Sequence, residues 1–142
     1  GVDFPDALAA GAAAGHLDGS LLLTEPTVLL GSTAAEIVRL APTRIVLIGG
    51  EDRISREVAA QIAALVPAAV TERIAGSDRY ETSRLIATRF FTGAVAAYIA
   101  TGDAFPDALV ASSLGGAQGR PVLLVNGAAT RLDPPTLTAL KS

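Results

Sequence analysis

Arginine side chains near the predicted starts of helices offer the clearest binding chemistry in this sequence. A guanidinium group matches planar anions such as phosphate and carboxylate. In a parallel α/β sheet the helix N-termini line one edge, where ligands of open sheets bind. Three arginines fall near such starts and would form an anion-facing rim: Arg53, Arg79 and Arg131. Three aspartates fall there too and can neutralise that rim: Asp52, Asp78 and Asp107.

The segment RIAGSDRYETS at 73–83 concentrates polar side chains at one predicted strand-to-helix turn. Its two arginines either bind a ligand anion or pair with Asp78. Asp78 and Glu81 suit a capping box, a structural role that competes with ligand contact. Tyr80 offers a ring and a hydroxyl to a sugar, or packs against the next element. The candidate ligand-binding residues are therefore Arg53, Arg73, Asp78, Arg79, Tyr80, Asp107 and Arg131.

Nucleophilic catalysis has little support in the residue types present. His16 is the only histidine and cysteine is absent, so a mixed His/Cys metal cluster is excluded. A Ser–His–Asp arrangement would have to use His16, whose counterpart in the repeat described below is Ala117. We expect no catalytic residue and no enzyme activity.

Carboxylates at the ends of strands are the basis of an alternative function. Such groups can hold Mg²⁺, which would make the chain a metal-dependent phosphoryl-transfer enzyme or hydrolase. Only Asp6 and Asp107 recur in both copies of the repeat, whereas Asp103 corresponds to Val2. A repeated acid in the first turn of a helix is also explained by the positive end of the helix dipole. We therefore expect no metal site and no cofactor.

The pattern of apolar residues predicts an α/β fold. Short apolar runs predict strands at 20–24, 44–48, 70–74, 95–100 and 121–125. Helical patterns alternate with them near 4–16, 33–41, 55–66, 78–91, 105–118 and 134–141. Such alternation indicates an open, mainly parallel sheet with helices on both faces. Gly49-Gly50 matches neither a phosphate loop nor a dinucleotide fingerprint, and we expect it to form a tight strand-to-helix turn.

Several helix starts carry local signals. Thr33 with Glu36, and Asp78 with Glu81, have capping-box spacing. Ser55 is a further N-cap candidate. Two prolines, Pro5 and Pro106, fall in first turns, where the missing N–H costs little.

The word FPDAL occurs at 4–8 and again at 105–109, an offset of 101 positions. In the same register, Leu21–Leu23 corresponds to Val122–Leu124. We interpret 1–101 as one complete, circularly offset repeat and 102–142 as the first half of the next. The strand that should precede residue 4 is missing, so we expect a slice of a longer tandem array, with any export signal upstream.

This offset predicts a competition between the two copies of one half-repeat. If strand 95–100 closes the sheet, helix 105–118 and strand 121–125 compete with 4–16 and 20–24 for one place. The copy that loses must pack outside or on another molecule. We therefore expect an extended second half-module or a domain-swapped oligomer.

Composition limits the classes of partner. The formal net charge is −3, which argues against general nucleic-acid binding. An excess of arginine over lysine also follows from a GC-rich genome. No apolar run approaches the roughly 20 residues of a membrane span.

Four motifs together resemble the cell wall-binding repeat 2 family of bacterial surface proteins. They are ATGDAFPDAL at 100–109, RPVLLV at 120–125, RIVLIGGEDRIS at 44–55 and RIAGSDRYETS at 73–83. The resemblance implies a non-catalytic module that holds a secreted protein non-covalently in the bacterial cell wall, outside the cell. Its implied partners are a wall polymer, anionic in clostridial members, and neighbouring repeats or further copies. A purely structural array element that binds only its neighbours is the third possibility.

Overall fold

The computed structural model describes residues 5–103 and 105–141 of the chain. Its contacts divide the chain into two compact units. One unit is Leu22–Ala75, and the other is built from 5–21 together with the described part of 76–141. Each unit has its own pair of parallel strands, and the two pairs do not join into one sheet within the described residues. The α/β class with parallel strands is thus confirmed.

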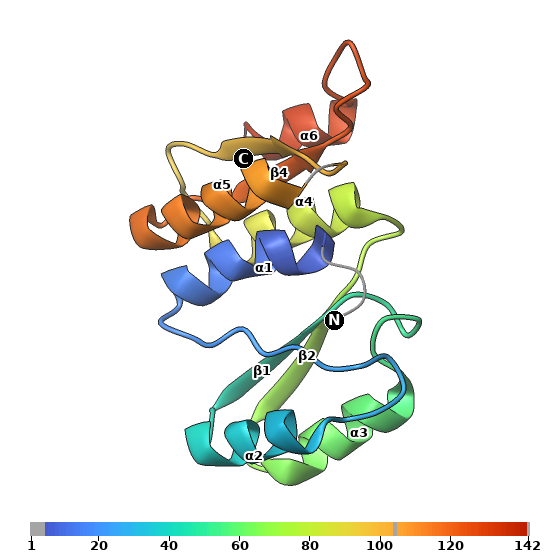
Figure 1. Ribbon diagram of the computed structural model, residues 1–142. Helices are drawn as coiled ribbons and strands as arrows, with labels where there is room; N and C mark the ends of the chain where they lie inside the picture. Colours follow the sequence, from blue (N-terminus) through green and yellow to red (C-terminus); the bar gives the residue numbers. More distant parts are fainter. Residues whose placement is uncertain (1–4, 104, 142) are drawn as a thin grey trace. The chain divides into compact units, whose positions relative to one another are not determined.

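Residues 22–75 of the first unit form two strands and two helices. Strand β1 (Arg44–Ile48) pairs in parallel with β2 (Val70–Ile74), with Leu47 opposite Arg73. Helices α2 (Gly31–Leu40) and α3 (Arg56–Leu65) lie on the same side of this pair (Figure 1). Their apolar stripes meet β1 in a small core made of Ile37, Leu47, Val58 and Ile62. Both strands occupy the ranges predicted from their apolar runs.

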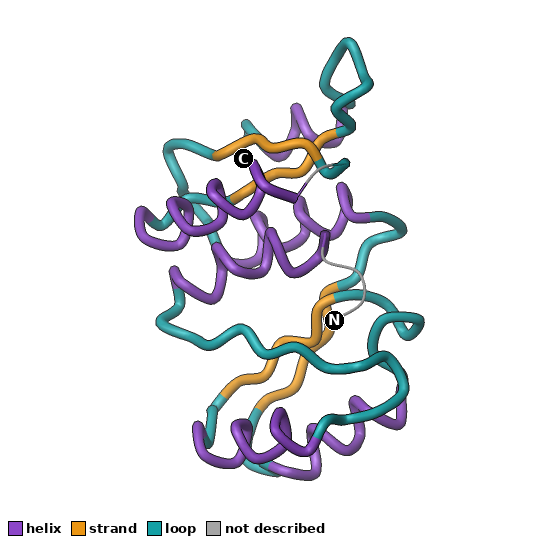
Figure 2. The backbone as a smooth tube through the Cα atoms, viewed as in Figure 1, coloured by secondary structure: helices purple, strands orange, loops and turns teal. Residues whose placement is uncertain are grey.

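The second unit is built around a shorter parallel pair, β3 (Tyr98–Thr101) and β4 (Val122–Val125). The described residues of this unit also form the helices α1 (Pro5–His16), α4 (Arg79–Phe90), α5 (Phe105–Gln118) and α6 (Pro134–Ala139). Figure 2 shows the strands in orange among the purple helices. Val122, Leu123 and Leu124 are all buried, as expected for a strand covered on both faces.

The strand predicted at 20–24 is wrong. Residues 18–25 carry no strand assignment, and Leu21, Leu22 and Leu23 are exposed. The corresponding segment of the second copy, β4, takes the place beside β3. A carbonyl of the first copy is satisfied by a side chain instead, since the Thr33 hydroxyl donates to the Leu23 carbonyl at 2.8 Å.

That contact also explains why the capping box predicted at Thr33 and Glu36 is wrong. Helix α2 begins two residues earlier, at Gly31, with Leu30 as an N-cap that makes no side-chain hydrogen bond. Thr33 is the third residue of this helix, and its side chain is buried. Glu36 instead forms an ion pair with Arg39, at 2.6 Å.

The other predicted helix starts are confirmed. The Ser55 hydroxyl accepts from the Val58 N–H at 3.3 Å, and Asp78 caps α4. Pro5 is the first residue of α1, and Pro106 is the second of α5. The Gly49-Gly50 turn is confirmed too, since Gly49 has a φ of 99°, which strongly favours glycine.

The two FPDAL helices, α1 and α5, pack directly on each other through matching small residues. A Cβ on Gly15 would lie 3.0 Å from the Cα of Gly116, and a Cβ on Gly11 would lie 2.5 Å from the Ser112 hydroxyl. Both pairs obey the 101-residue offset of the repeat. Since equivalent residues face each other twice, four residues apart, the helices run in parallel with their backbones close together.

Candidate functional site

Asp103 is the centre of a polar cluster that lies just beyond the C-terminal ends of β3 and β4. Its carboxylate accepts from the Gly127 N–H at 3.0 Å, the Tyr80 hydroxyl at 3.1 Å and the Thr101 hydroxyl at 3.2 Å. The Gly127 amide, followed by the Tyr80 hydroxyl, holds the pKa of Asp103 below its ordinary value. Since Asp103 is exposed, a charged acceptor at this strand end can reach solvent.

The first turn of α4 brings Arg79 and Tyr80 to the same strand end. The Arg79 guanidinium donates to the Gly102 carbonyl at 2.7 Å. Partial burial, and then the bond to Asp103, raise the pKa of Tyr80 above its ordinary value. A Cβ on Gly102 would lie 2.8 Å from the Tyr80 ring and 3.0 Å from the Arg79 stem. The glycine of the ATGD segment therefore leaves room for both side chains.

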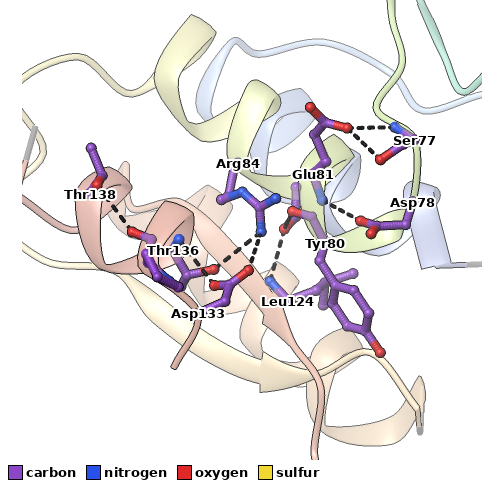
Figure 3. A network of polar contacts seen from close by, with 11 residues as sticks. Ser77, Asp78, Tyr80, Glu81, Arg84, Leu124, Asp133, Thr136 and Thr138 are labelled. Atoms are coloured by element: carbon purple, nitrogen blue, oxygen red, sulfur yellow. Dashed lines mark hydrogen bonds and ion pairs between the residues drawn. The ribbon is translucent and has the colours of Figure 1, made fainter. Parts of the chain in front are cut away.

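Asp78 and Glu81 have the structural role that their spacing predicts. The Asp78 carboxylate accepts from the Glu81 N–H at 2.7 Å, and Glu81 accepts from the N–H and hydroxyl of Ser77 at 2.6 and 2.7 Å (Figure 3). The Ser77 amide contributes most to a lowered pKa of Glu81. The start of α4 is thereby fixed, and with it the position of the two side chains that follow.

The next turn of α4 joins this helix to β4 and α6. The buried Ser83 hydroxyl accepts from the Leu124 N–H at 3.0 Å. Arg84 donates to Asp133 at 3.1 Å and to the Thr136 hydroxyl at 3.3 Å, as Figure 3 shows. Asp133 in turn caps α6, and its hydrogen bonds with Thr136 keep its pKa low. These contacts hold α4, the helix that carries Arg79 and Tyr80, in a fixed position against β4 and α6.

The two remaining residues predicted in this unit are both exposed. Asp107 lies in the first turn of α5, four residues after Asp103. Arg131 lies in the loop between β4 and α6, four residues after the Gly127 amide that contacts Asp103. Both therefore follow the same strand ends along the chain.

Arg53 and Arg73 belong to the other unit. The Arg73 guanidinium is used internally: it donates to the carbonyls of Gly49, Gly50 and Ile54 at 2.7, 3.0 and 2.8 Å. It thereby holds the loop between β1 and α3. The Arg53 guanidinium lies 3.3 Å from Asp52, on the exposed side of that loop.

The structure thus brings Arg79 and Tyr80 together with a residue that sequence reasoning did not select. The repeat argues against Asp103, because Val2 occupies its position in the other copy. A signal was available: Asp103 stands in ATGDAFPDAL, directly after a predicted strand and its glycine. Acids at the ends of parallel strands converge on one edge, whether or not they recur in a repeat.

Two features of the described residues bear on other classes of function. No group of three or more His, Cys, Asp or Glu side chains in 5–103 and 105–141 is placed to hold a metal ion. In the same part of the chain, no helix has the length and apolar character needed to cross a membrane.

Comparison with known proteins gives a consistent result. The family described as cell wall binding domain 2 (CWB2) matches residues 1–59 and 73–141. Two solved structures from Clostridium difficile are similar. Cwp6 has a TM-score of 0.80 and 34% identity, over 90% of this chain and 20% of that one. Cwp8 has a TM-score of 0.79 and 28% identity, over 96% of this chain and 24% of that one.

A curated relative is the amidase enhancer of Bacillus subtilis (strain 168), which is 33% identical over 121 residues. The match covers 85% of this chain and 17% of that protein. The chain thus spans about a sixth of the length of this relative, and a fifth to a quarter of the two Clostridium proteins.

Proposed function

Because the chain belongs to the cell wall binding domain 2 family, we propose that it is a non-catalytic module that anchors a larger secreted protein to the bacterial cell wall. The attachment is non-covalent, and the ligand is a wall glycopolymer carrying hydroxyl and anionic groups. The module then acts outside the cell, on a polymer that presents the same chemical groups many times. The observation that carries the proposal is the family match over nearly the whole chain.

The polar edge of the β3–β4 unit is the surface we assign to the polymer. Asp103 and Tyr80 form a hydrogen-bonded pair that can accept from, or donate to, sugar hydroxyls. Arg79 makes one hydrogen bond within the described residues, through Nη1, so further donors of its guanidinium can serve an anion. Arg131 and Asp107 extend this surface along the loops that follow the two strands.

Asp78, Arg73 and Arg53 have supporting parts in this proposal. Asp78 sets the first turn of α4 and so aims Arg79 and Tyr80. Arg73 holds the turn after β1 in the other unit, and Arg53 stands on that turn. We propose that Arg53 contacts a second stretch of the same polymer, and that Arg73 positions it.

Charge at this edge favours recognition by individual groups over bulk attraction. Two arginines (Arg79 and Arg131) lie there among three aspartates (Asp78, Asp103 and Asp107), and the whole chain has a formal net charge of −3. At long range, an acidic protein and an anionic polymer repel each other. We therefore expect wall binding to survive moderate salt, because salt also screens the repulsion.

Cosedimentation with purified walls of a Gram-positive bacterium tests the proposal. The full chain should sediment with intact walls and fail to sediment with walls from which the anionic polymers have been extracted. Equal sedimentation with both would contradict the assignment of an anionic polymer. The absence of binding to either would contradict wall anchoring by this chain.

A matched pair of arginine variants locates the surface. Arg131→Gln should weaken wall binding several-fold, because it removes a cation from the proposed polymer surface. Arg89→Gln should leave binding unchanged, because Arg89 lies in the last turn of α4, away from the helix start that bears the cluster. Both residues are exposed, so circular dichroism should show the fold unaltered in each. Equal loss in the two variants would place the polymer elsewhere.

A further inference from the structure

Asn126 is the only asparagine in the sequence, and a glycine follows it. It is exposed and comes directly after β4, at the strand end that carries the Asp103 cluster. A glycine after asparagine leaves the backbone nitrogen unhindered, because glycine has no Cβ to keep that nitrogen away from the asparagine carboxamide carbon. Asn126 and Gly127 therefore form a chemically reactive pair on the surface of the protein.

Contacts around this pair explain why these two residue types stand here. A Cβ on Gly127 would lie 2.6 Å from the Thr101 hydroxyl oxygen and 3.2 Å from Asp103 Oδ2, so a larger residue would displace those side chains. The Asn126 carboxamide oxygen accepts from the Ala128 N–H at 2.9 Å, which is the turn that asparagine and aspartate favour. The local structure thus calls for both members of the reactive pair.

We propose that Asn126 is a site of spontaneous deamidation, and that Asp103 slows the reaction. The Gly127 nitrogen loses its proton and attacks Asn126 Cγ, and ammonia leaves as the N–Cγ bond closes a succinimide ring. Water then opens this ring. Cleavage of the N–Cγ bond gives aspartate, whereas cleavage of the bond to the backbone carbonyl carbon gives isoaspartate. Overall, the reaction consumes water and releases ammonia, and it involves no oxidation or reduction.

The contact with Asp103 acts on the attacking nitrogen itself. The Gly127 N–H donates to Asp103 Oδ2 at 3.0 Å. A carboxylate acceptor favours the protonated form of its donor, whereas the attack requires the deprotonated nitrogen. The hydrogen bond must also break before the nitrogen can approach Asn126 Cγ. Both effects make the folded chain react more slowly than an unfolded one.

The other copy of the repeat lacks this chemistry. At the 101-residue offset, Glu25 and Pro26 stand in place of Asn126 and Gly127. A proline nitrogen carries no hydrogen, so it has no proton to lose when an imide ring closes. We therefore assign the reaction to the second copy alone.

Deamidation changes the edge to which we assign the wall polymer, and this consequence rests on the proposed function. Either product carries a new negative charge close to Asp103, which disfavours an anionic ligand. Isoaspartate also adds a methylene group to the main chain and so shifts the Gly127 N–H relative to Asp103. Arg131 lies farther along the same loop. The module should therefore hold an anionic polymer less tightly as it ages.

Ion-exchange chromatography and mass spectrometry of the full chain test the reaction. The chain is incubated in mildly alkaline buffer, beside a synthetic peptide of residues 120–131 that gives the rate without the fold. We expect the folded chain to form an acidic species about tenfold more slowly than the peptide, because the loop must open first. Fragmentation should place the change at residue 126. Asn126→Gln is the matched control and should form no such species in this time, because glutamine would have to close a larger ring.

Two measurements test the part played by Asp103. Asp103→Ala should accelerate deamidation toward the rate of the peptide, with circular dichroism to check that the variant is folded. The unaltered chain in urea should react at the peptide rate, which measures the restraint of the fold without any substitution. An unchanged rate in folded Asp103→Ala would contradict the restraint by Asp103. No acidic species after about a hundred half-times of the peptide would overturn the site itself, since local opening would then never expose it.

Cosedimentation with cell walls tests the consequence for binding. The acidic species, separated by ion exchange, should bind walls several-fold more weakly than the fresh chain. Asn126→Gln should bind equally before and after the same incubation. Equal binding of the acidic and fresh chains would refute the loss of affinity. A fresh chain that binds no wall would contradict the proposed function alone, because charge and mass report deamidation without any wall present.

Discussion

Replacing Gly116 by alanine tests the close parallel contact between α1 and α5. In an exposed helix this change stabilises, because alanine has a higher helix propensity than glycine by about 1 kcal/mol. In this structure the added Cβ would lie 3.2 Å from the Cα of Gly15 and 3.4 Å from the Ala12 carbonyl oxygen. Both neighbours are backbone atoms of another helix, so they cannot rotate away as a side chain would.

The balance of the two terms sets the expected magnitude. Forcing an extra carbon into a packed core costs about 1–3 kcal/mol. Subtracting the propensity gain leaves a net destabilisation of about 0–2 kcal/mol. In a domain of 60–100 residues each kcal/mol lowers the melting temperature by about 4–8 °C. Gly15→Ala should act in the same direction, because its added Cβ would lie 3.0 Å from the Cα of Gly116.

Gly19→Ala is the matched control in the same unit. A Cβ there would lie 3.6 Å from its nearest neighbour, the Ala14 carbonyl oxygen, which is an ordinary contact. With no clash, the lower entropy of the unfolded chain should stabilise the protein by about 0.4–1 kcal/mol. Urea unfolding followed by circular dichroism gives the free energies. If Gly116→Ala stabilises as much as Gly19→Ala, the backbones of α1 and α5 are not in contact.

Three further predictions concern the polar framework. Asp78→Ala should lower the free energy of unfolding by about 1 kcal/mol, whereas Asp78→Asn, which can still cap α4, should lower it less; urea unfolding that ranks the two equally would contradict the cap. Arg73→Met should destabilise the protein by about 1–3 kcal/mol, because three carbonyls of the β1–α3 loop lose their donor. Amide hydrogen exchange should speed up first in that loop. Unchanged exchange there would show that the donor is dispensable. The pKa of Asp103 is lowered in the folded protein, so its contribution to stability is present above the ordinary carboxyl value of 3.8 and is lost as pH falls through the lower folded value. Asp103→Asn should therefore flatten the acid side of the pH–stability curve. Thermal unfolding between pH 2 and 7 measures this curve.

Local features of the fold were predictable because they depend on neighbours in the chain. The range of β1 follows from an apolar run, and that of β2 from a short segment with apolar ends at Val70 and Ile74. The start of α4 follows from the spacing of Asp78 and Glu81. Thr33 and Glu36 have the same spacing, but they do not cap a helix, because α2 begins at Gly31 and a tertiary contact uses the Thr33 side chain. The Thr33 hydroxyl is buried against the Leu23 carbonyl, a partner ten residues away that spacing cannot reveal.

The candidate site was predictable in part for a similar reason. Arg79 and Tyr80 stand next to a recognisable helix cap, so their place at a helix start could be inferred. Asp103 could not be inferred in this way, because its contact with the Gly127 amide joins the ends of two different strands. Arg73 looked like a ligand residue in the sequence, yet the carbonyls it binds lie about 20 residues away in the chain, a contact that parallel strand pairing creates.

The different fates of the two repeat copies follow from chain connectivity as much as from composition. Strand β4 follows β3 after about 20 residues, whereas about 70 residues separate segment 20–24 from β3, and closing the longer loop costs about 1 kcal/mol more. At the 101-residue offset, the paired segment has Val122 and Val125 where the unpaired one has Leu21 and the polar Thr24, and apolar β-branched residues suit a buried strand. Both terms favour β4, so strengthening 20–24 with valines alone should leave the connectivity term in place and should not exchange the strands.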